Sequence, residues 1–329
     1  MGERENIAIS TRIRLARNYS DIPFPAMMNA AWANESIHRA ASAIGHLDEE
    51  YLVRPIADLG DVERALLVEK RLISPGFRNK LDGAIIHNRQ ESVSIMVNEE
   101  DHMRIQVLLY GLRLDEALSI ANKVDDGIGE RIDYAFNDRL GYLTSCPTNT
   151  GTGLRASVML HLPMLTRMHG MESMIKALGN LGMTVRGLYG EGSRATGELY
   201  QLSNQVTLGR TEQEVLDALK SAARQIIQVE QHARGQAKQK SRLDLEDRLM
   251  RSYGTLSYAV KISTAEAMQL LSDVRLAADI GLIEGLSAAK LNQIMQLIQP
   301  AALMHAAGRA LNGLERAQQR AQIIKNILL

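Results

Sequence analysis

The chain has 329 residues, of which 45% are hydrophobic, so it is long enough to bury a large core in about two domains. Lysine and arginine together number 38, as do aspartate and glutamate, so the formal net charge is zero and no global field can hold a polyanion or an anionic membrane. The single cysteine, Cys146, excludes an intramolecular disulfide framework, and no run approaches the roughly 18 apolar residues of a membrane span. The sequence therefore predicts a cytoplasmic protein that binds any anion through a local basic cluster.

Short runs that alternate apolar and polar residues fill the first two thirds of the chain. The clearest of them places Val93, Ile95 and Val97 on one face of a strand. Further strands are predicted at residues 7–9, 84–87, 140–145, 157–162, 184–188 and 199–208, with helices at 61–72 and 114–124. These elements lack the regular strand-helix alternation of a parallel sheet. The pattern predicts an α+β fold in which helices flank a largely antiparallel sheet.

From residue 212 the sequence becomes helical. Val215, Leu219, Ala222 and Ile226 recur at spacings of four and three, which predicts one amphipathic helix. Residues 231–251 are highly charged and are interpreted as a solvated helix or connector, with a domain boundary after residue 240. Three more helices are predicted: one that starts at a capping box at 263–266, one at 287–298, and one from about 314 to the end. Residues 1–240 and 241–329 are thus expected to form a sheet domain and a small helical domain.

Five arginines occur where strand ends and glycine-rich turns are predicted. Arg12 and Arg14 lie two apart, so in a strand both guanidinium groups point to the same side. Arg104 follows an acidic string, Arg155 follows a Gly-Thr-Gly turn, and Arg186 begins the string 186–191. A lone arginine is usually a surface ion-pair partner, but a group of this kind suits a shared polyanion because guanidinium binds phosphate through two bonds. The sequence has no Walker-type phosphate loop, so a nucleotide triphosphate would be held by arginine side chains.

Carboxylates and one thiol are the other candidates for chemistry. Glu99, Glu100 and Asp101 directly follow an apolar strand, where they indicate either nearby cations or a solvated turn. Glu191 lies between two glycines, which suits a loop tip as well as a catalytic lid. Cys146 is interpreted either as a small buried hydrophobe or as a thiol whose pKa is lowered by arginines. The histidines lack metal-ligand spacing, so no metal held by the protein is expected.

Four strings, at residues 10–17, 98–104, 146–157 and 186–191, resemble the phosphagen kinases, the superfamily of arginine and creatine kinases. The resemblance is strongest to the bacterial McsB family of protein arginine kinases, which residues 161–163, 202–209 and 271–276 also fit. It covers the chain from about residue 7 to its end. It implies a glutamine-synthetase-like catalytic domain with an antiparallel sheet, followed by a helical dimerisation and regulatory domain.

The same resemblance implies the site. The residues it assigns to ATP are Ser10, Thr11, Arg12, Ile13, Arg14, Arg71, Arg104, Arg155, Ala156, Ser157, Val158, Met159, Arg186, Gly187, Leu188, Tyr189, Gly190 and Glu191. Segments 155–159 and 186–191 would be loops that close around the nucleotide, and Mg²⁺ would be held mainly by phosphates and water. Glu100 and Glu191 would bracket the substrate guanidinium, with Cys146 against its far nitrogen. A guanidinium is a poor nucleophile until a carboxylate orients it and accepts its proton.

The resemblance implies ATP-dependent phosphorylation of arginine in proteins. It also implies a homodimer, an activator protein, a Clp ATPase and a stress-response repressor as partners, without nucleic acid or membrane. Kinases of small guanidino compounds carry a larger helical domain before the arginine motif, and this domain is expected to be absent because the motif begins at Ser10. A kinase of free arginine and an inactive scaffold that binds phosphoarginine are the alternatives.

Arg71 and Ala317 are among the positions that depart from the family pattern. Arg71 stands where the family commonly has a histidine near the nucleotide. Residues 316–321 stand where the family has Arg-Asp-x-x-Arg-Ala, its allosteric phosphoarginine motif, and Ala317 replaces the acidic member. Arg316 and Arg320 are therefore expected to signal weakly, and the alternative for this pair is a solvated basic helix face.

Overall fold

The computed structural model describes residues 6–187 and 195–329. The chain divides into two compact units. The sheet unit comprises Ser10–Val158 and Ser203–Ser221, and the helical unit comprises Met1–Ile9, Met159–Leu202 and Ala222–Leu329. The domain boundary after residue 240 stays a prediction. It falls where one long helix ends at Lys240 and the next begins at Arg242.

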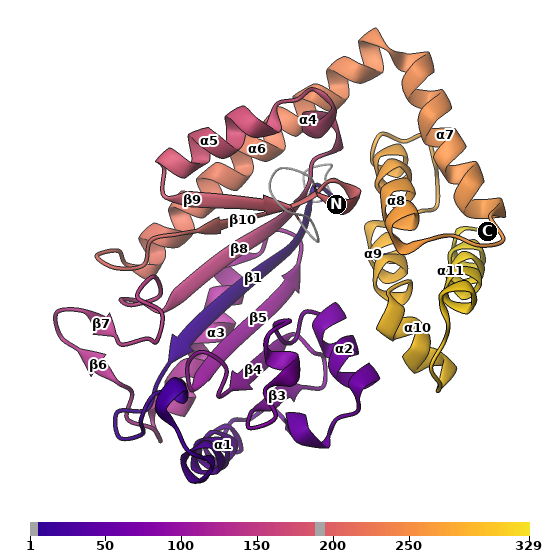
Figure 1. The fold of residues 1–329 in the computed structure, drawn as a ribbon. Helices are drawn as coiled ribbons and strands as arrows, with labels where there is room; N and C mark the ends of the chain where they lie inside the picture. The colour runs from indigo at the N-terminus through magenta and orange to yellow at the C-terminus, as the bar shows by residue number, and fades with distance from the viewer. Residues whose placement is uncertain (1–5, 188–194) are drawn as a thin grey trace. The chain divides into compact units, whose positions relative to one another are not determined.

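The strands of the sheet unit are mostly antiparallel. The strands of the described chain are β1 (Ala8–Arg17), β2 (Tyr51–Pro55), β3 (Ala84–Asn88), β4 (Val93–Val97), β5 (Met103–Tyr110), β6 (Phe136–Asn137), β7 (Gly141–Tyr142), β8 (Leu154–His161), β9 (Met183–Gly187) and β10 (Leu199–Asn204). In the sheet unit the order is β2-β3-β4-β5-β1-β8 (Figure 1), and the neighbouring strands from β2 to β1 in this order pair antiparallel. The predicted antiparallel sheet is confirmed. β2 and β5 were not predicted, and the strand expected at 140–145 is only two residues long.

Helices make up most of the helical unit. The helices of the described chain are α1 (Ala30–Ile44), α2 (Asp61–Glu69), α3 (Leu114–Gly129), α4 (Pro163–Arg167), α5 (Met171–Asn180), α6 (Glu212–Lys240), α7 (Arg242–Tyr258), α8 (Thr264–Asp279), α9 (Ala288–Leu297), α10 (Pro300–Ala307) and α11 (Gly313–Leu328). The predicted start of α8 is confirmed, because the Ser263 side chain accepts a hydrogen bond from the Glu266 amide. The prediction missed α10, a short helix that begins with Pro300.

Register in the sheet places basic side chains together. Ile13 and Leu15 of β1 are fully buried on one face, and Arg12 and Arg14 point to the other face. Arg14 lies opposite Gln106 of β5, and Ala16 lies opposite Arg104. Directly opposed residues of an antiparallel pair lie on the same face, so Arg12, Arg14 and Arg104 share one face of the sheet.

The helical unit has a core of its own. Leu256 of α7, Leu271 and Val274 of α8, Ile294 of α9 and Ile324 of α11 are buried in one apolar cluster, and Figure 1 shows these helices gathered in the C-terminal part of the chain. Fully burying one such side chain stabilises a fold by about 1.5–3 kcal/mol. The last quarter of the chain is therefore a packed helical body, as the sequence predicts.

The charged stretch after residue 231 is less solvated than predicted. α6 continues through it without a break to Lys240. Arg234 is buried, and its guanidinium pairs with Glu230 at 2.8 Å and with Asp279 of α8 at 2.9 Å. Buried charges need such partners because desolvation is costly. No helix among the described residues is long and apolar enough to cross a membrane.

Candidate active site

Five arginines form one cluster in the sheet unit, called the arginine cluster below: Arg12 and Arg14 of β1, Arg71 after α2, Arg104 of β5 and Arg155 of β8. The pKa of Arg12 is lowered to about 10, chiefly by burial and then by the positive charges of Arg71, Arg104 and Arg155. Each of these neighbours is therefore close enough to repel Arg12. Four segments that are far apart in the sequence thus bring five positively charged side chains together.

Arg14 brings a buried donor to the arginine cluster. Its pKa is well below the usual value, chiefly through burial and then through Arg12, Arg104 and Arg155, whereas Glu99 opposes the shift. Its Nε is buried without a hydrogen-bond partner among the described residues. A buried donor left unpaired costs about 1–3 kcal/mol. The cluster therefore has the charge and the free donor that the phosphates of a nucleotide would satisfy.

Arg71 joins the arginine cluster through an uncommon backbone conformation. Its φ of 62° lies in the left-handed region, just after α2 ends. The Arg71 carbonyl accepts a hydrogen bond of 2.7 Å from the Gln106 amide of β5. This bond holds the turn against the strand that carries Arg104. The position predicted from its departure from the family pattern therefore lies beside the other arginines.

Two carboxylates adjoin the arginine cluster. Glu99 and Glu100 both pair with Arg104, the latter at 3.0 Å between Glu100 Oε2 and Arg104 Nη2. The Glu99 side chain is 13% exposed and also bonds the Ser74 hydroxyl, whereas the Glu100 side chain is 46% exposed. Glu100 is thus the carboxylate that a substrate can reach. Its ion pair with Arg104 links it to the arginine cluster.

Cys146 lies in a turn whose backbone is held from several sides. The thiol is half-buried, with Sγ 3.1 Å from the Thr148 hydroxyl. The Thr207 hydroxyl lies 3.0 Å from the Thr148 carbonyl and 2.7 Å from the Thr150 carbonyl. At the end of the turn, Gly153 has a φ of +66°, and a Cβ there would lie 2.6 Å from the Arg17 guanidinium. Only glycine fits such a position.

Arg17 supports this turn and was not among the predicted site residues. Its guanidinium is buried, pairs with Asp125 at 2.6 Å and donates to the Thr152 carbonyl at 3.0 Å. It also lies 3.5 Å from the centre of the Tyr142 ring, a cation–π contact. The sequence signal that could have identified Arg17 was its place at the end of the string 10–17. Strand alternation puts its side chain on the face of β1 opposite to that of Arg14.

The other predicted nucleotide residues fall into three groups. Ser10, Thr11 and Ile13 are buried in β1, where the Thr11 hydroxyl donates to the Gly111 carbonyl at 2.7 Å and accepts from the Arg113 amide at 3.0 Å. Arg186 is exposed in β9, which ends at Gly187. Leu188, Tyr189, Gly190 and Glu191 lie outside the described residues.

The loop expected at residues 155–159 is wrong. Arg155, Ala156, Ser157, Val158 and Met159 all belong to β8, and the last four are buried. The Asn204 side chain bonds the Ala156 amide at 2.8 Å and the Leu154 carbonyl at 3.1 Å, which completes the pairing of the strand end. Arg155 is therefore presented by a strand, and its position is set by the sheet.

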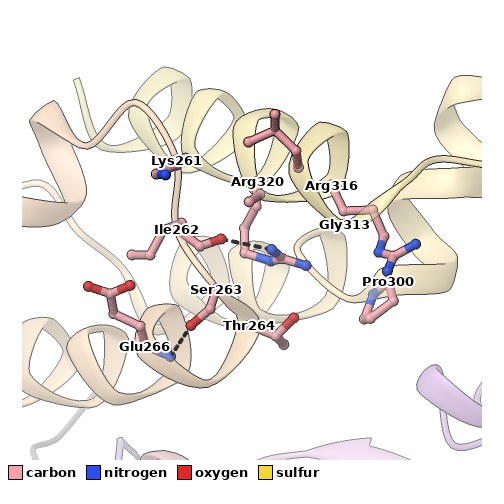
Figure 2. A pocket seen from close by; sticks show the side chains of 11 residues that line it. Lys261, Ile262, Ser263, Thr264, Glu266, Pro300, Gly313, Arg316 and Arg320 are labelled. Atoms are coloured by element: carbon pink, nitrogen blue, oxygen red, sulfur yellow. Dashed lines mark hydrogen bonds between the residues drawn. The ribbon is translucent and has the colours of Figure 1, made fainter.

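A further cavity of about 500 Å³ lies in the helical unit (Figure 2). Its lining includes Lys261, Glu266, Arg316, Ala317 and Arg320. Arg320 is 3% exposed, and its guanidinium donates to the Ile298 carbonyl at 2.8 Å and to the Ile262 carbonyl at 2.9 Å. The solvated basic face proposed as the alternative for this pair is therefore wrong for Arg320. Neither cavity nor arginine cluster holds a metal-ligand set, since residues 6–187 and 195–329 contain no group of three potential His, Cys, Asp or Glu ligands.

Comparison with known proteins gives two family matches. Residues 33–233 match the sequence profile of the ATP:guanido phosphotransferase C-terminal catalytic domain, and residues 242–329 match that of the protein-arginine kinase McsB C-terminal domain. The first match contains Arg104, Cys146 and Arg155 and begins after Arg12 and Arg14.

Relatives match over nearly the whole chain. The protein-arginine kinases of Bacillus velezensis and Bacillus subtilis are each 46% identical over 99% of this chain and 91% of their own length. That of Pelotomaculum thermopropionicum is 45% identical over 98% of this chain and 93% of its length. Among solved structures, a lombricine kinase matches with a TM-score of 0.62 and 26% identity over 70% of this chain and 67% of its own. The substrate-free duplicated taurocyamine kinase from Schistosoma mansoni gives a TM-score of 0.63 and 25% identity, over 77% of this chain and 39% of its own.

Proposed function

The chain belongs to the ATP:guanido phosphotransferases and, within them, to the protein-arginine kinase family, and on this premise we propose that it transfers the γ-phosphoryl group of ATP to the guanidinium of arginine in proteins. The observation that carries the proposal is the arginine cluster, with its unpaired buried donor on Arg14, next to the accessible carboxylate of Glu100. The first suits a triphosphate, and the second suits a guanidinium. Phosphoryl transfer depends mainly on such positioning and charge neutralisation.

We assign the phosphates to Arg12, Arg14, Arg71, Arg104 and Arg155. Burial and then mutual repulsion lower the pKa of Arg12 and Arg14, and the repulsion is relieved when an anion lies among the arginines. The backbone and side chains of Ser10, Thr11, Ile13 and residues 156–159 would support these arginines, and Arg186 to Glu191 would complete the site. Mg²⁺, held mainly by phosphates and water, would neutralise charge on the transferring group.

Glu100 is the proposed base. Its carboxylate would orient the substrate guanidinium and accept a proton as a guanidinium nitrogen attacks the γ-phosphorus. The new N–P bond forms as the bond between that phosphorus and the bridging oxygen breaks, and ADP leaves with the electron pair. Glu191 would hold the guanidinium from its other side, and the Cys146 thiol would face the far nitrogen. General base catalysis of this kind is typically worth about 10²- to 10⁴-fold.

Protein arginine rather than free arginine is the proposed substrate. The match of residues 242–329 to the C-terminal domain of protein-arginine kinases supports this choice. The decisive measurement is mass spectrometry of a protein incubated with ATP and Mg²⁺, worked up without acid because the P–N bond is acid-labile. Phosphoarginine in the protein is expected with the wild type and not with Glu100→Gln. Transfer to free arginine alone would support a small-guanidino kinase. Transfer to neither protein arginine nor free arginine would support the inactive scaffold.

Regulation and partners follow from the same resemblance. We propose that the cavity beside Arg316 and Arg320 takes phosphoarginine weakly, because Ala317 offers its guanidinium no carboxylate. The helical domain would form a homodimer, and an activator protein, a Clp ATPase and a stress-response repressor would be partners in the cytoplasm. Gel filtration with light scattering tests the dimer, and pull-down with the purified candidates tests the others.

A further inference from the structure

Asp101 is fully buried although it directly follows the exposed Glu100. One of its carboxylate oxygens, Oδ1, accepts a hydrogen bond of 2.7 Å from the backbone amide of Ser145. Ser145 immediately precedes Cys146 and is 44 residues away from Asp101 in the sequence. A single buried side chain thus joins the string that carries Glu100 to the turn that carries Cys146.

Asn18 reinforces this connection. Its side-chain amide donates to Asp101 Oδ1 at 2.7 Å and to the Leu143 carbonyl at 3.0 Å. Its Oδ1 accepts from the His102 backbone amide at 2.8 Å. Asn18 is 1% exposed, so these bonds form where water does not compete. Asp101 and Asn18 therefore hold the two strings to each other, just after Glu100 in one string and just before Cys146 in the other.

We propose that Asp101 is a positioning residue for phosphoryl transfer, acting through the Ser145 amide to fix the distance between the Glu100 carboxylate and the Cys146 thiol. The inference rests on the proposed function, in which both groups face one guanidinium. A planar substrate held between two groups requires that their separation be constant, and a misplacement of about 1 Å can cost about 10²-fold in rate. Residues that contact a substrate are usually held at a constant separation by hydrogen bonds from supporting residues behind them.

The bond pattern favours this role over ordinary core stability. The acceptor used by Ser145 and Asn18 is a single oxygen, Oδ1, and Asp101 Oδ2 is buried without a hydrogen-bond partner in the described chain. A carboxylate placed only for stability would be expected to have both oxygens paired. Asparagine retains an acceptor at Oδ1, whereas alanine removes it. Comparing the two variants therefore separates the effect of the hydrogen bond to Ser145 from the effect of the Asp101 charge.

The single cysteine of the chain makes the position of the turn measurable. The rate at which iodoacetamide alkylates the native protein reports on Cys146 alone. For Asp101→Ala we expect kcat to fall about 10²-fold, KM for ATP to change less than about threefold, and the alkylation rate to change several-fold. For Asp101→Asn we expect kcat to stay within about tenfold and the alkylation rate within about twofold of the wild type, as a partial rescue.

Asp273→Ala is the matched control. Asp273 is also a buried aspartate, with partners Arg167 and Ser252 in the helical unit. Its substitution is expected to lower the melting temperature and to leave Cys146 alkylation unchanged. If Asp101→Ala does not fold, Asn18→Ala removes the bonds to Asp101 and to Leu143 and is expected to shift kcat and alkylation in the same direction.

Failure of this inference differs from failure of the proposed function. If Glu100→Gln retains full activity, the proposed base is wrong whatever Asp101 does. If Glu100→Gln is inactive but folded Asp101→Ala keeps wild-type kcat, Asp101 does not position the site. The inference is also overturned if Asp101→Ala loses activity with wild-type alkylation and ATP affinity, since the turn would then be unmoved.

Discussion

Arg14 shows how much a single residue of the arginine cluster contributes. Its Nε is a buried donor without a partner in the described residues, and its charge is opposed by three neighbouring arginines. For Arg14→Gln we expect KM for ATP to rise roughly 10- to 100-fold, because a charged hydrogen bond worth about 1.5–3 kcal/mol is lost. Removing the charge relieves repulsion, so the melting temperature without nucleotide should stay the same or rise.

Steady-state kinetics at varied ATP and thermal melts measure these two quantities. Arg139→Gln, an exposed arginine of the same unit, serves as the control and should change neither. An Arg14→Gln enzyme with the KM of the wild type would remove Arg14 from the phosphate site.

Residue spacing predicted part of the site and could not predict the rest. Strand alternation is local, so the positions of Arg12 and Arg14 on one side of β1 follow from their spacing of two. The burial of Arg320 depends on the Ile262 and Ile298 carbonyls, which lie far away in the sequence. The bond from Ser145 to Asp101 is equally non-local. Such contacts appear only once the chain has folded.

At the scale of elements, the turn before β10 is fitted closely to α8. Gly197 has a φ of 66°, and a Cβ there would lie 2.9 Å from the Met268 carbonyl of α8. The adjacent Glu198 is buried and accepts from the Gln269 amide at 2.8 Å. For Gly197→Ala we expect a loss of about 1–3 kcal/mol in unfolding free energy from conformational strain and the close contact.

Chemical denaturation measures this loss, with Gly281→Ala as the control. Gly281 belongs to the same unit and has a φ of +78° with open space around its Cβ, so only the conformational part of the cost applies. Equal losses in the two variants would show that the contact with α8 carries no energy.

Elements with local signals were predicted well, and those without them were not. The serine cap places the start of α8, and alternation places β4. β2 has half-exposed side chains and ends in a proline, so its pairing with β3 has no signal in its own sequence. α6 runs on through its charged part because Gln, Ala, Arg and Lys are strong helix formers, and its contact with Asp279 comes from tertiary packing.

At the scale of the whole molecule, buried histidines predict a stability that depends on pH. Burial is the largest cause that lowers the pKa of His102 to about 4, and the pKa of the fully buried His161 also falls well below its usual value. A histidine in the unfolded chain has a pKa of about 6.5. Between pH 4 and pH 6.5 the unfolded chain therefore binds more protons than the folded chain. The stabilisation is complete above about pH 6.5 and is lost as the pH falls toward 4.

The titration of His102 alone should lower the free energy of unfolding by about 2 kcal/mol as the pH falls from 7.5 to 5. Melts without substrate across this range are expected to show a falling midpoint, with a shallower slope in His102→Gln. A midpoint that is flat from pH 7.5 to 5 would contradict the buried neutral histidines.

The cavity of the helical unit tests whether the departure at residue 317 weakens regulation. Arg316, Ala317 and Arg320 line this cavity, and the Arg320 guanidinium is already engaged by the Ile262 and Ile298 carbonyls. A phosphate can still pair with cations there, but a guanidinium attached to it finds no carboxylate at residue 317.

We expect free phosphoarginine to stimulate the wild type less than about twofold and to stimulate Ala317→Asp more strongly, since a charged hydrogen bond adds about 1.5–3 kcal/mol. Titration of phosphoarginine into the kinase assay, with Arg316→Ala in both backgrounds, measures the effect. Strong saturable activation of the wild type that Arg316→Ala abolishes would show that the acidic residue is dispensable.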